Sequence, residues 1–292
     1  MQDPPAAGDA TPVEPHMPAR IDLLAAAQCL LEAYSVLSWN HSQHAEDLLL
    51  LPTLVAAARG RSGRFVELGA LDGVSFSNTL LLERCFGWQG LLIEANPTNF
   101  GQLSASGRRA VMRHSAVCSG PDGFVNVSKR GGAVAGMASV RSAFHRSHFA
   151  SQTRGEMVQV PCTSLTGLMA EAGLPKANFL SLDVEGAEAL VLAAVDPGVF
   201  DLIVVERDSS DADRMQRVHT LITQAGLQRA DSLHVPYSLV YVRRGVVERP
   251  LDRTVYLEAV PGYKGRVRPA RRLDAAELAR LLALPSGSNE DL

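Results

Sequence analysis

The pattern of apolar and polar positions changes near residue 64. Upstream, residues 21–37 and 46–58 carry apolar side chains at helical spacing, which predicts two helices. Downstream, short runs rich in Val, Ile, Leu and Phe alternate with helical stretches, and such runs are typical of strands buried on both faces. The predicted strands cover residues 64–68, 90–94, 111–117, 178–183 and 202–206.

Helical stretches separate these strands and define the predicted fold class. They cover residues 77–85, 97–106, 164–172, 186–195 and 211–225. Strand–helix–strand units with short connections form parallel sheets covered on both faces, which predicts a Rossmann-like α/β fold with a mostly parallel sheet. Two further runs, 228–231 and 237–243, are predicted to close the sheet as a hairpin-like pair.

Composition divides the chain into four parts. Residues 1–20 contain five prolines and no apolar run, so a disordered leader is expected there. A helical segment (21–60) and the sheet domain (61–245) follow, and a basic extension with one helix at 274–284 occupies residues 246–292.

A basic insertion over the sheet is predicted within that domain, at about residues 123–155. It has no Asp or Glu, and it contains Lys129, Arg130, Arg141, Arg146 and Arg154. These cations are the reason to expect an acceptor that is anionic.

Charge and cysteine spacing limit the classes of function. The formal net charge of −3 argues against a protein that binds nucleic acid through its overall charge. No apolar stretch is long enough to span a membrane and no secretory signal is evident, so a cytoplasmic protein is expected. The four cysteines stand far apart without a zinc or disulfide pattern, so buried reduced thiols are predicted.

A glycine turn after the first predicted strand is the strongest local signal. The turn passes through Gly69 and Gly73, where a ligand can approach the backbone at the carboxyl edge of the sheet. A dinucleotide site would need two more glycines where Leu71 and Val74 stand. Acidic residues in and beside this turn favour a cationic ligand without phosphates, such as S-adenosylmethionine.

The next two strand ends supply further candidate binding residues. Glu94 follows Gly69 by roughly 25 residues, near the spacing at which an acidic residue binds ribose hydroxyls. The alternative for Glu94 is an acid at the start of the next helix. The third predicted strand brings Ser115 and Ala116 to the same edge, where adenine is commonly held.

Carboxylates also end the last two parallel strands. Asp183 and Glu185 follow the fourth strand and are candidates for the catalytic base or for a contact to an amine. Capping of the following helix is the alternative for this pair, and Glu188 is expected to be structural. Glu206 ends the fifth strand, so a divalent metal such as magnesium could bind here, but none is predicted.

Several segments together resemble the FkbM-type methyltransferase family. They are Phe-Val-Glu-Leu-Gly-Ala-Leu-Asp-Gly at 65–73, Ile-Glu-Ala-Asn-Pro at 93–97 and Leu-Asp-Val-Glu-Gly-Ala-Glu at 182–188. Upstream, Ser-Gln-His-Ala-Glu-Asp at 42–47 is similar to a segment that usually has glycine where Ala45 stands. Ser-Asn-Thr-Leu at 77–80 and Gly-Trp-Gln-Gly-Leu at 87–91 are similar to the eukaryotic Star-like branch.

The resemblance implies a class I methyltransferase that transfers a methyl group from S-adenosylmethionine to a hydroxyl of a sugar or other small-molecule or glycan acceptor. Asp183 and Glu185 are then the catalytic candidates, with His145 or His148 as alternatives from the insertion. The expected cofactor-binding residues are Gln43, Asp47, Glu67, Gly69, Ala70, Asp72, Gly73, Ser77, Asn78, Glu94, Ala95, Asn96, Ser115, Ala116 and Asp183. Three alternatives remain: a non-catalytic Star-like protein, a dehydrogenase-like Rossmann enzyme and a nucleic-acid methyltransferase.

Overall fold

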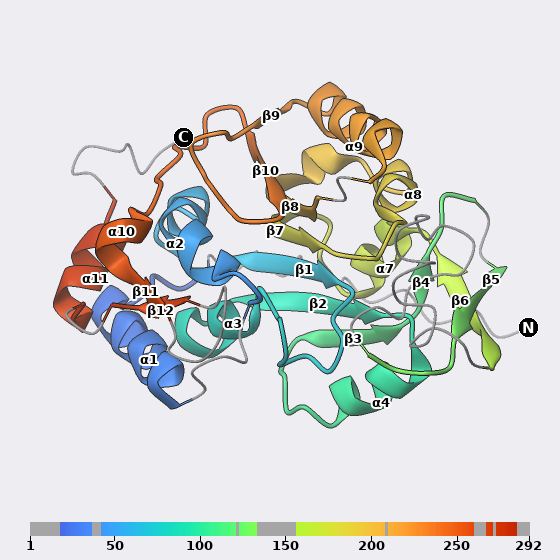
Figure 1. The fold of residues 1–292 in the computed structure, drawn as a ribbon, viewed down its shortest axis with the longest axis horizontal. Coiled ribbons are helices and arrows are strands. Elements are labelled where there is room, and N and C mark those ends of the chain that lie inside the picture. The colour runs from blue at the N-terminus through green and yellow to red at the C-terminus, as the bar shows by residue number, and fades with distance from the viewer. Residues whose placement is uncertain are drawn as a thin grey trace, which may run out of the picture.

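A seven-stranded sheet forms the centre of the protein in a computed structural model (Figure 1). The structure describes residues 18–36, 42–120, 123–132, 156–207, 210–259, 267–270 and 273–284. In spatial order the strands are β3 (Val111–His114), β2 (Gln89–Glu94), β1 (Arg64–Leu68), β7 (Ala177–Leu182), β8 (Phe200–Glu206), β10 (Ser238–Arg243) and β9 (Leu227–Arg229).

The first five of these strands are parallel, and β10 runs antiparallel to both β8 and β9. The mixed α/β class with a mostly parallel sheet is therefore confirmed, and so is the closing antiparallel pair. Strand β1 is central, with Phe65 opposite both Gly90 and Phe179.

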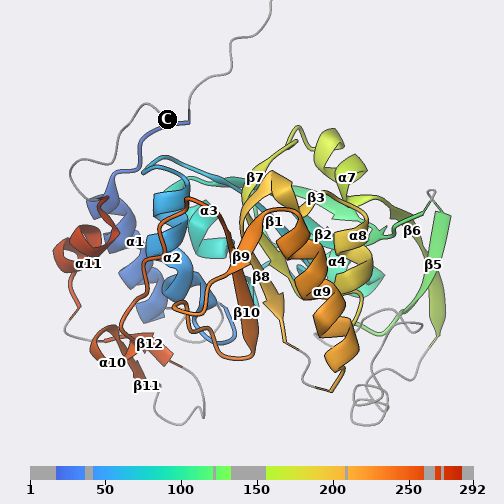
Figure 2. The same cartoon turned by 90° about the horizontal axis from the view of Figure 1, so that it is seen from above.

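Helices cover both faces of the sheet, as Figure 2 shows from above. One face packs against α7 (Leu165–Glu171), α8 (Glu188–Ala193) and α9 (Ala212–Gln224). The other packs against α1 (Leu23–Val36), α2 (Glu46–Ala57), α3 (Leu80–Phe86) and α11 (Ala275–Leu282). Neighbouring strand residues point to opposite faces, so Phe65 joins one apolar core and Val66 joins the other.

The two ends of the described chain meet in one layer. Helix α11 packs against α1 and α2, although more than 200 residues separate them in sequence. Near α11, the basic extension also forms α10 (Arg253–Tyr256) and a two-stranded sheet of β11 (Leu257–Ala259) and β12 (Val267–Pro269). The predicted leader falls almost wholly on residues 1–17, which lie outside the described residues.

The predicted strand 111–117 is divided in two. Strand β3 stays in the main sheet, whereas β4 (Ala116–Val117) pairs with β6 (Met157–Thr163) in a second sheet. Strand β5 (Gly123–Ser128) pairs antiparallel with β6 on its other side. The predicted insertion therefore begins with a regular strand, and its residues 133–155 lie outside the described residues.

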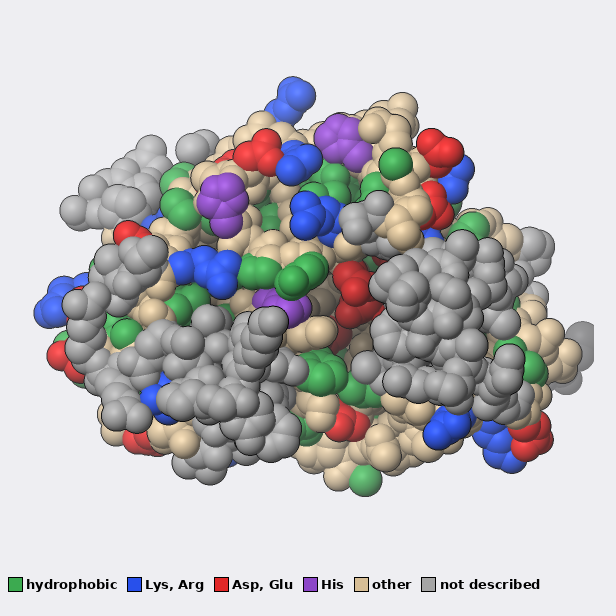
Figure 3. Space-filling model, in the orientation of Figure 1, with side chains coloured by type: hydrophobic (Ala, Val, Ile, Leu, Met, Phe, Trp, Pro, Cys, Tyr) green, Lys and Arg blue, Asp and Glu red, His purple; other side chains and the backbone are tan. Residues whose placement is uncertain are grey.

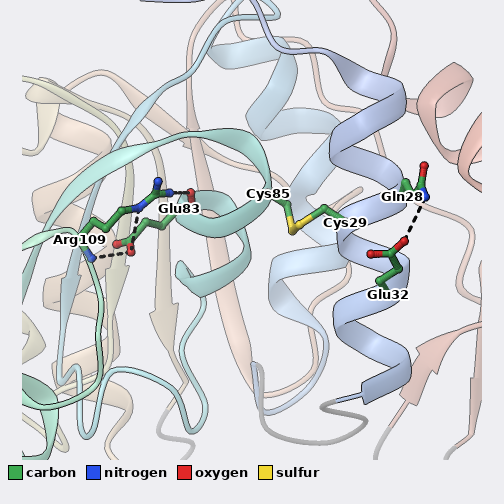
Figure 4. Close-up of a disulfide and its surroundings, with 6 residues drawn as sticks. All are labelled: Gln28, Cys29, Glu32, Glu83, Cys85 and Arg109. Carbon is green, nitrogen blue, oxygen red and sulfur yellow. Dashed lines mark hydrogen bonds and ion pairs between the residues drawn. A yellow bond between two sulfur atoms is a disulfide. The ribbon is translucent and has the colours of Figure 1, made fainter.

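Two disulfides join distant segments, so the prediction of reduced thiols is wrong. Cys29 of α1 bonds Cys85 of α3, which ties the N-terminal helix to the sheet domain (Figure 4). Cys118 bonds Cys162 of β6 within the second sheet. The partners are 56 and 44 residues apart in sequence, and only the tertiary fold brings them together.

Membrane-spanning helices were not expected from the sequence. Among the residues that the structure describes, no helix combines the length and apolar character that a membrane crossing requires.

Candidate functional site

A cavity of about 270 Å³ lies at the carboxyl ends of β1, β2 and β7, and we call it the first cavity. This edge of an α/β sheet is where ligands usually bind. Twelve of the predicted site residues line it: Gln43, Glu67, Gly69, Ala70, Ser77, Asn78, Glu94, Ala95, Ser115, Ala116, Asp183 and Glu185.

The glycine turn after β1 is shaped by a close approach to β7. Gly69 has φ +76°, and a Cβ there would lie 1.8 Å from the backbone oxygen of Asp183. Only glycine fits this contact. Asp72 holds the rest of the turn, because its carboxylate accepts from the backbone N–H groups of Val74 and Ser75.

Glu67 organises the segment that follows the turn. Its carboxylate accepts from the hydroxyls of Ser77 (2.8 Å) and Thr79 (2.6 Å) and from the backbone N–H of Asn78 (2.8 Å). These bonds hold residues 77–79 outside the helix, so α3 begins at Leu80 rather than at the predicted Ser77. Glu67 thus borders the first cavity while it fixes the local backbone.

Glu94 connects the end of β2 to the glycine turn. Its two carboxylate oxygens accept from the backbone N–H groups of Leu71 (2.8 Å) and Asn96 (2.7 Å). Burial raises the pKa of Glu94 to about 7, although these N–H donors favour the ionised form. Glu94 also lines the first cavity, so its carboxylate can be reached by a ligand.

Two asparagines link α4 (Pro97–Ser104) to the chain beyond β5. Asn96 caps the helix by accepting from the backbone N–H groups of Thr98 and Asn99, and its side-chain amide donates to the backbone oxygen of Ser128. Asn99 exchanges hydrogen bonds with the backbone of Gly132 and lines the first cavity. Sequence reasoning missed Asn99, which lies two residues beyond the motif at 93–97.

Three carboxylates meet at the ends of β7 and β8. Oxygens of Asp183, Glu185 and Glu206 all lie within 4.8 Å of one another. The pKa of Asp183 is raised well above its usual value, first by burial among protein atoms around the cavity and then by repulsion from Glu206 and Glu185. Asp183 still exposes surface to the cavity, so its carboxyl can reach a ligand.

A hydrogen bond joins Asp183 to Glu206 and also raises the Asp183 pKa. One proton shared between two carboxyl groups relieves their repulsion. A divalent cation bound by the three oxygens would do the same. Metal binding therefore stays a hypothesis with a compatible set of donors, as the sequence indicated.

Glu188 differs from these neighbours because it is held in the scaffold. It accepts from the backbone N–H of Gly186 (2.9 Å), and its other oxygen lies 3.5 Å from Nε of the buried Arg214. The structural role expected for Glu188 agrees with these contacts.

The segment before α2 reaches over the first cavity. Ser42 forms a backbone bridge with Phe76, which places Gln43 in the cavity lining. Ala45 has φ +62°, a conformation that favours glycine, in line with the glycine that the resemblance led us to expect at this position. Asp47 is buried, and its carboxylate accepts from the hydroxyls of Tyr34 (2.7 Å) and Ser42 (2.5 Å).

Four predicted cofactor-binding residues do not line the first cavity: Asp47, Asp72, Gly73 and Asn96. Their side chains or backbone are used to shape the segments around it. Conversely, sequence reasoning missed Leu71 inside the glycine turn and several lining residues outside the motifs: Ser75, Phe76, Asn99, Gly132 and Ser181. Phe76 has φ +62°, which its sequence context does not reveal.

The basic insertion can be followed only in part. Lys129 forms an exposed ion pair with Glu156 at 2.8 Å, so part of the positive charge of the insertion is neutralised. Arg141, Arg146, Arg154, His145 and His148 lie outside the described residues. The expected anionic acceptor and the two histidine alternatives stay predictions.

A profile described as the methyltransferase FkbM domain matches residues 67–230, more than half of the chain. A search of curated protein sequences found no match.

Solved structures similar to the chain include methyltransferase FkbM from Methylobacillus flagellatus KT, with 13% identity, a TM-score of 0.37, 62% of this chain covered and 43% of that chain. Another is precorrin-6y C5,15-methyltransferase from Geobacter metallireducens GS-15, with 10% identity, a TM-score of 0.33, 65% of this chain covered and 86% of that chain. The chain thus spans less than half the length of the first of these structures.

Proposed function

Because the chain belongs to the FkbM methyltransferase family, we propose that it transfers a methyl group from S-adenosylmethionine to a hydroxyl oxygen of a sugar or another small-molecule or glycan acceptor. A methyltransferase fold is consistent with the order of the main sheet.

The charge of the first cavity is the observation that carries this proposal. Five carboxylates line it, of which Glu67 is paired with the buried Arg108 outside the lining, and no Lys, Arg or His is among the described lining residues. The carboxylates are those of Glu67, Glu94, Asp183, Glu185 and Glu206. S-adenosylmethionine carries a cationic ammonium and a sulfonium and no phosphate, so its charge is complementary, whereas the pyrophosphate of NAD would be repelled.

Each part of S-adenosylmethionine can be assigned to residues that line the first cavity. Glu94, whose oxygens accept from two backbone N–H groups beside the first cavity, is the proposed acceptor for the ribose hydroxyls. Ala116 and Val117 offer an apolar wall to adenine. Asp183 and Glu185 also line the first cavity and are the proposed contacts for the ammonium group or the acceptor hydroxyl.

The chemical step needs a base and a fixed orientation. S-adenosylmethionine, when bound, supplies an activated methyl group whose departure from sulfur requires no acid. The chain must hold the acceptor oxygen in line with that methyl group and remove the hydroxyl proton. Asp183 is the proposed base because its raised pKa makes its ionised form a stronger proton acceptor than an ordinary carboxylate.

Isothermal titration calorimetry tests the cofactor. The wild type is expected to bind S-adenosylmethionine with a Kd in the micromolar range, and Glu94→Gln should weaken binding by roughly 10- to 100-fold, because hydrogen bonds to a charged group are lost. Glu171→Gln is the matched control, since Glu171 is exposed on α7 and does not line the cavity. NAD serves as the control ligand.

Failure of a folded wild type to bind S-adenosylmethionine would remove the proposed activity and favour a non-catalytic protein on the same fold. Tighter binding of NAD would instead indicate a dehydrogenase-like site. If the cofactor binds, transfer of its labelled methyl group to a panel of hydroxylated acceptors tests the second half of the proposal.

A further inference from the structure

A second cavity of about 320 Å³ adjoins the first. Six residues line both cavities: Gln43, Phe76, Asn78, Ser181, Asp183 and Glu206. The proposed base Asp183 therefore stands at the junction of the two spaces. A cofactor in the first cavity and an acceptor in the second would meet at this residue.

Acidic groups dominate the walls of the second cavity. Glu46, Asp183 and Glu206 line it, and Arg207 is the only Lys or Arg among its described lining residues. These carboxylates would repel an anionic group, while the hydroxyl groups or the ammonium of a ligand would find acceptors among them.

An aromatic side chain stands at the edge of this acidic space. Tyr237 is 63% exposed although it lines the second cavity. Its ring lies 4.7 Å from the ring of His44, tilted by 39°. Its backbone has φ +57°, which bulky residues rarely adopt, and its carbonyl accepts from the backbone N–H of Arg207 at 2.7 Å.

Figure 3 shows acidic side chains exposed near the middle of this face of the molecule, with hydrophobic and histidine side chains beside them. An aromatic face beside carboxylates suits a ring that has both a C–H face and hydroxyl groups. The C–H face can lie against the electron-rich aromatic surface while the hydroxyls donate to the carboxylates. Neither a flat hydrophobic ligand nor a phosphorylated one uses both features.

We propose that the second cavity is the acceptor site and that it selects a polyhydroxylated ring without an anionic group, neutral or amino-substituted, which stacks on Tyr237 and donates hydroxyls to Asp183 and Glu206. This inference rests on the proposed function, because it assigns the first cavity to the cofactor. It differs from the sequence-based expectation of an anionic acceptor.

Saturation-transfer NMR on the full chain, saturated with S-adenosylhomocysteine so that no turnover occurs, provides the test. The probes are methyl hexopyranosides in matched sets, each with a neutral member, a 2-amino member and a 6-carboxylate member. Neutral or amino members should bind at least tenfold more tightly than the carboxylate of the same set. Tyr237→Ala should weaken binding of the preferred ring at least tenfold, whereas Tyr237→Phe should retain it.

Phe124→Ala is the matched control, since Phe124 is 69% exposed on β5 and lines neither cavity. Calorimetry with S-adenosylhomocysteine on each variant separates the two proposals, because Tyr237 does not line the first cavity. Loss of cofactor binding by the wild type would overturn the proposed function. If the cofactor binds, any of three results would overturn this inference alone. They are tighter binding of the carboxylate probes, no binding of a neutral or amino ring, and unchanged ring binding in Tyr237→Ala.

Discussion

Two groups of acidic side chains near the first cavity have opposite surroundings. Glu67 and Glu83 share the buried cation Arg108, whose Nε lies 3.2 Å from Glu83 and whose Nη1 lies 4.0 Å from Glu67. Asp183, by contrast, is acted on by other carboxylates, chiefly Glu206 and Glu185. We call the first set the Arg108 network and the second the Asp183 cluster.

The Arg108 network holds backbone in place. Arg108 also donates to the backbone oxygen of Gly73 (2.6 Å) and to the hydroxyl of Thr79 (2.9 Å). Glu83 accepts from the backbone N–H groups of Arg109 (2.7 Å) and Ala110 (3.1 Å). Nearly every polar atom of the Arg108 and Glu83 side chains has a hydrogen-bond partner. The network therefore joins the glycine turn, α3 and the start of β3.

The comparison shows two ways in which this fold uses carboxylates. A carboxylate with a cation and several N–H donors is a structural element, since its charge is already stabilised. Carboxylates that repel one another raise the free energy of the protein until a proton, a cation or a donor-bearing ligand binds. The two sets therefore predict different consequences of removing one charge.

The largest expected effect is on the reaction. Asp183→Asn should lower kcat for methyl transfer by roughly 10²- to 10⁴-fold, because an amide cannot accept the acceptor proton. Initial rates with a labelled methyl donor measure this, with Asp213→Asn on the exposed start of α9 as the control. An unchanged rate would assign the base to Glu185 or Glu206.

The same variant should not lower stability. The folded-state pKa of Asp183 is raised above its unfolded value, so the protein loses stability as pH rises through the folded pKa. Asparagine does not ionise, so the variant lacks this loss of stability at higher pH. The Tm of Asp183→Asn, compared with wild type at pH 5 and pH 8, should therefore be relatively higher at pH 8.

The opposite result is expected in the Arg108 network. Arg108→Met should lower the free energy of unfolding by about 3–5 kcal/mol, because Glu67 and Glu83 would stay buried without their cation. Urea denaturation measures this. Arg109→Met is the matched control: its side chain is 69% exposed, and its ion pair with Glu83 should contribute less than about 1 kcal/mol.

The sequence could predict the strands and the acids at their ends, because buried parallel strands form compact apolar runs and the sheet brings their carboxyl ends together. It could not separate the two acidic groups. Glu67 and Asp183 both end strands, and only the position of Arg108, some 40 residues beyond Glu67, shows which one is neutralised.

The sequence could not predict the second cavity or the pairing of the cysteines either, because both depend on contacts between distant segments. Tyr237 and Glu46 come from segments nearly 200 residues apart and meet only in the tertiary fold.

The domain boundaries expected at residues 60 and 245 stay predictions. In the structure, α1, α2 and α11 share one apolar core with the sheet.

A covalent bond further stabilises the region of the Arg108 network. Cys85 lies two residues after Glu83 on α3, and its disulfide to Cys29 attaches this helix to α1 (Figure 4). The double variant Cys29→Ala with Cys85→Ala should lower the free energy of unfolding by about 2–4 kcal/mol, since the bond closes a 56-residue loop. Wild type in strong reductant should show a similar loss in urea denaturation.

This measurement also bears on location. Disulfides persist mainly in oxidising compartments, so a stabilising pair would argue against the expected cytoplasmic location. Equal stability of the oxidised and reduced wild type would leave the cytoplasmic prediction in place and show that packing alone holds α3.

The smallest predicted effect concerns Glu94, whose pKa is raised to about 7 by burial in the first cavity. The ionised form should bind a cationic, hydroxyl-bearing cofactor, so binding requires loss of the proton and affinity should fall as pH drops below 7. Between pH 8 and pH 6 the ionised fraction of a group with this pKa falls about tenfold. Calorimetry should therefore show that the Kd of the wild type for S-adenosylmethionine rises by about tenfold between pH 8 and pH 6, relative to the change in Glu94→Gln.

The comparison with Glu94→Gln is needed because the ligand's own amine and Asp183 also titrate, and the variant retains both. Parallel pH profiles in the two proteins would show that Glu94 does not bind the cofactor in its ionised form, and would assign it to the structural role of joining Leu71 to Asn96. Glu94 would then belong with the Arg108 network, and the division between the two acidic groups would have to be redrawn at β2.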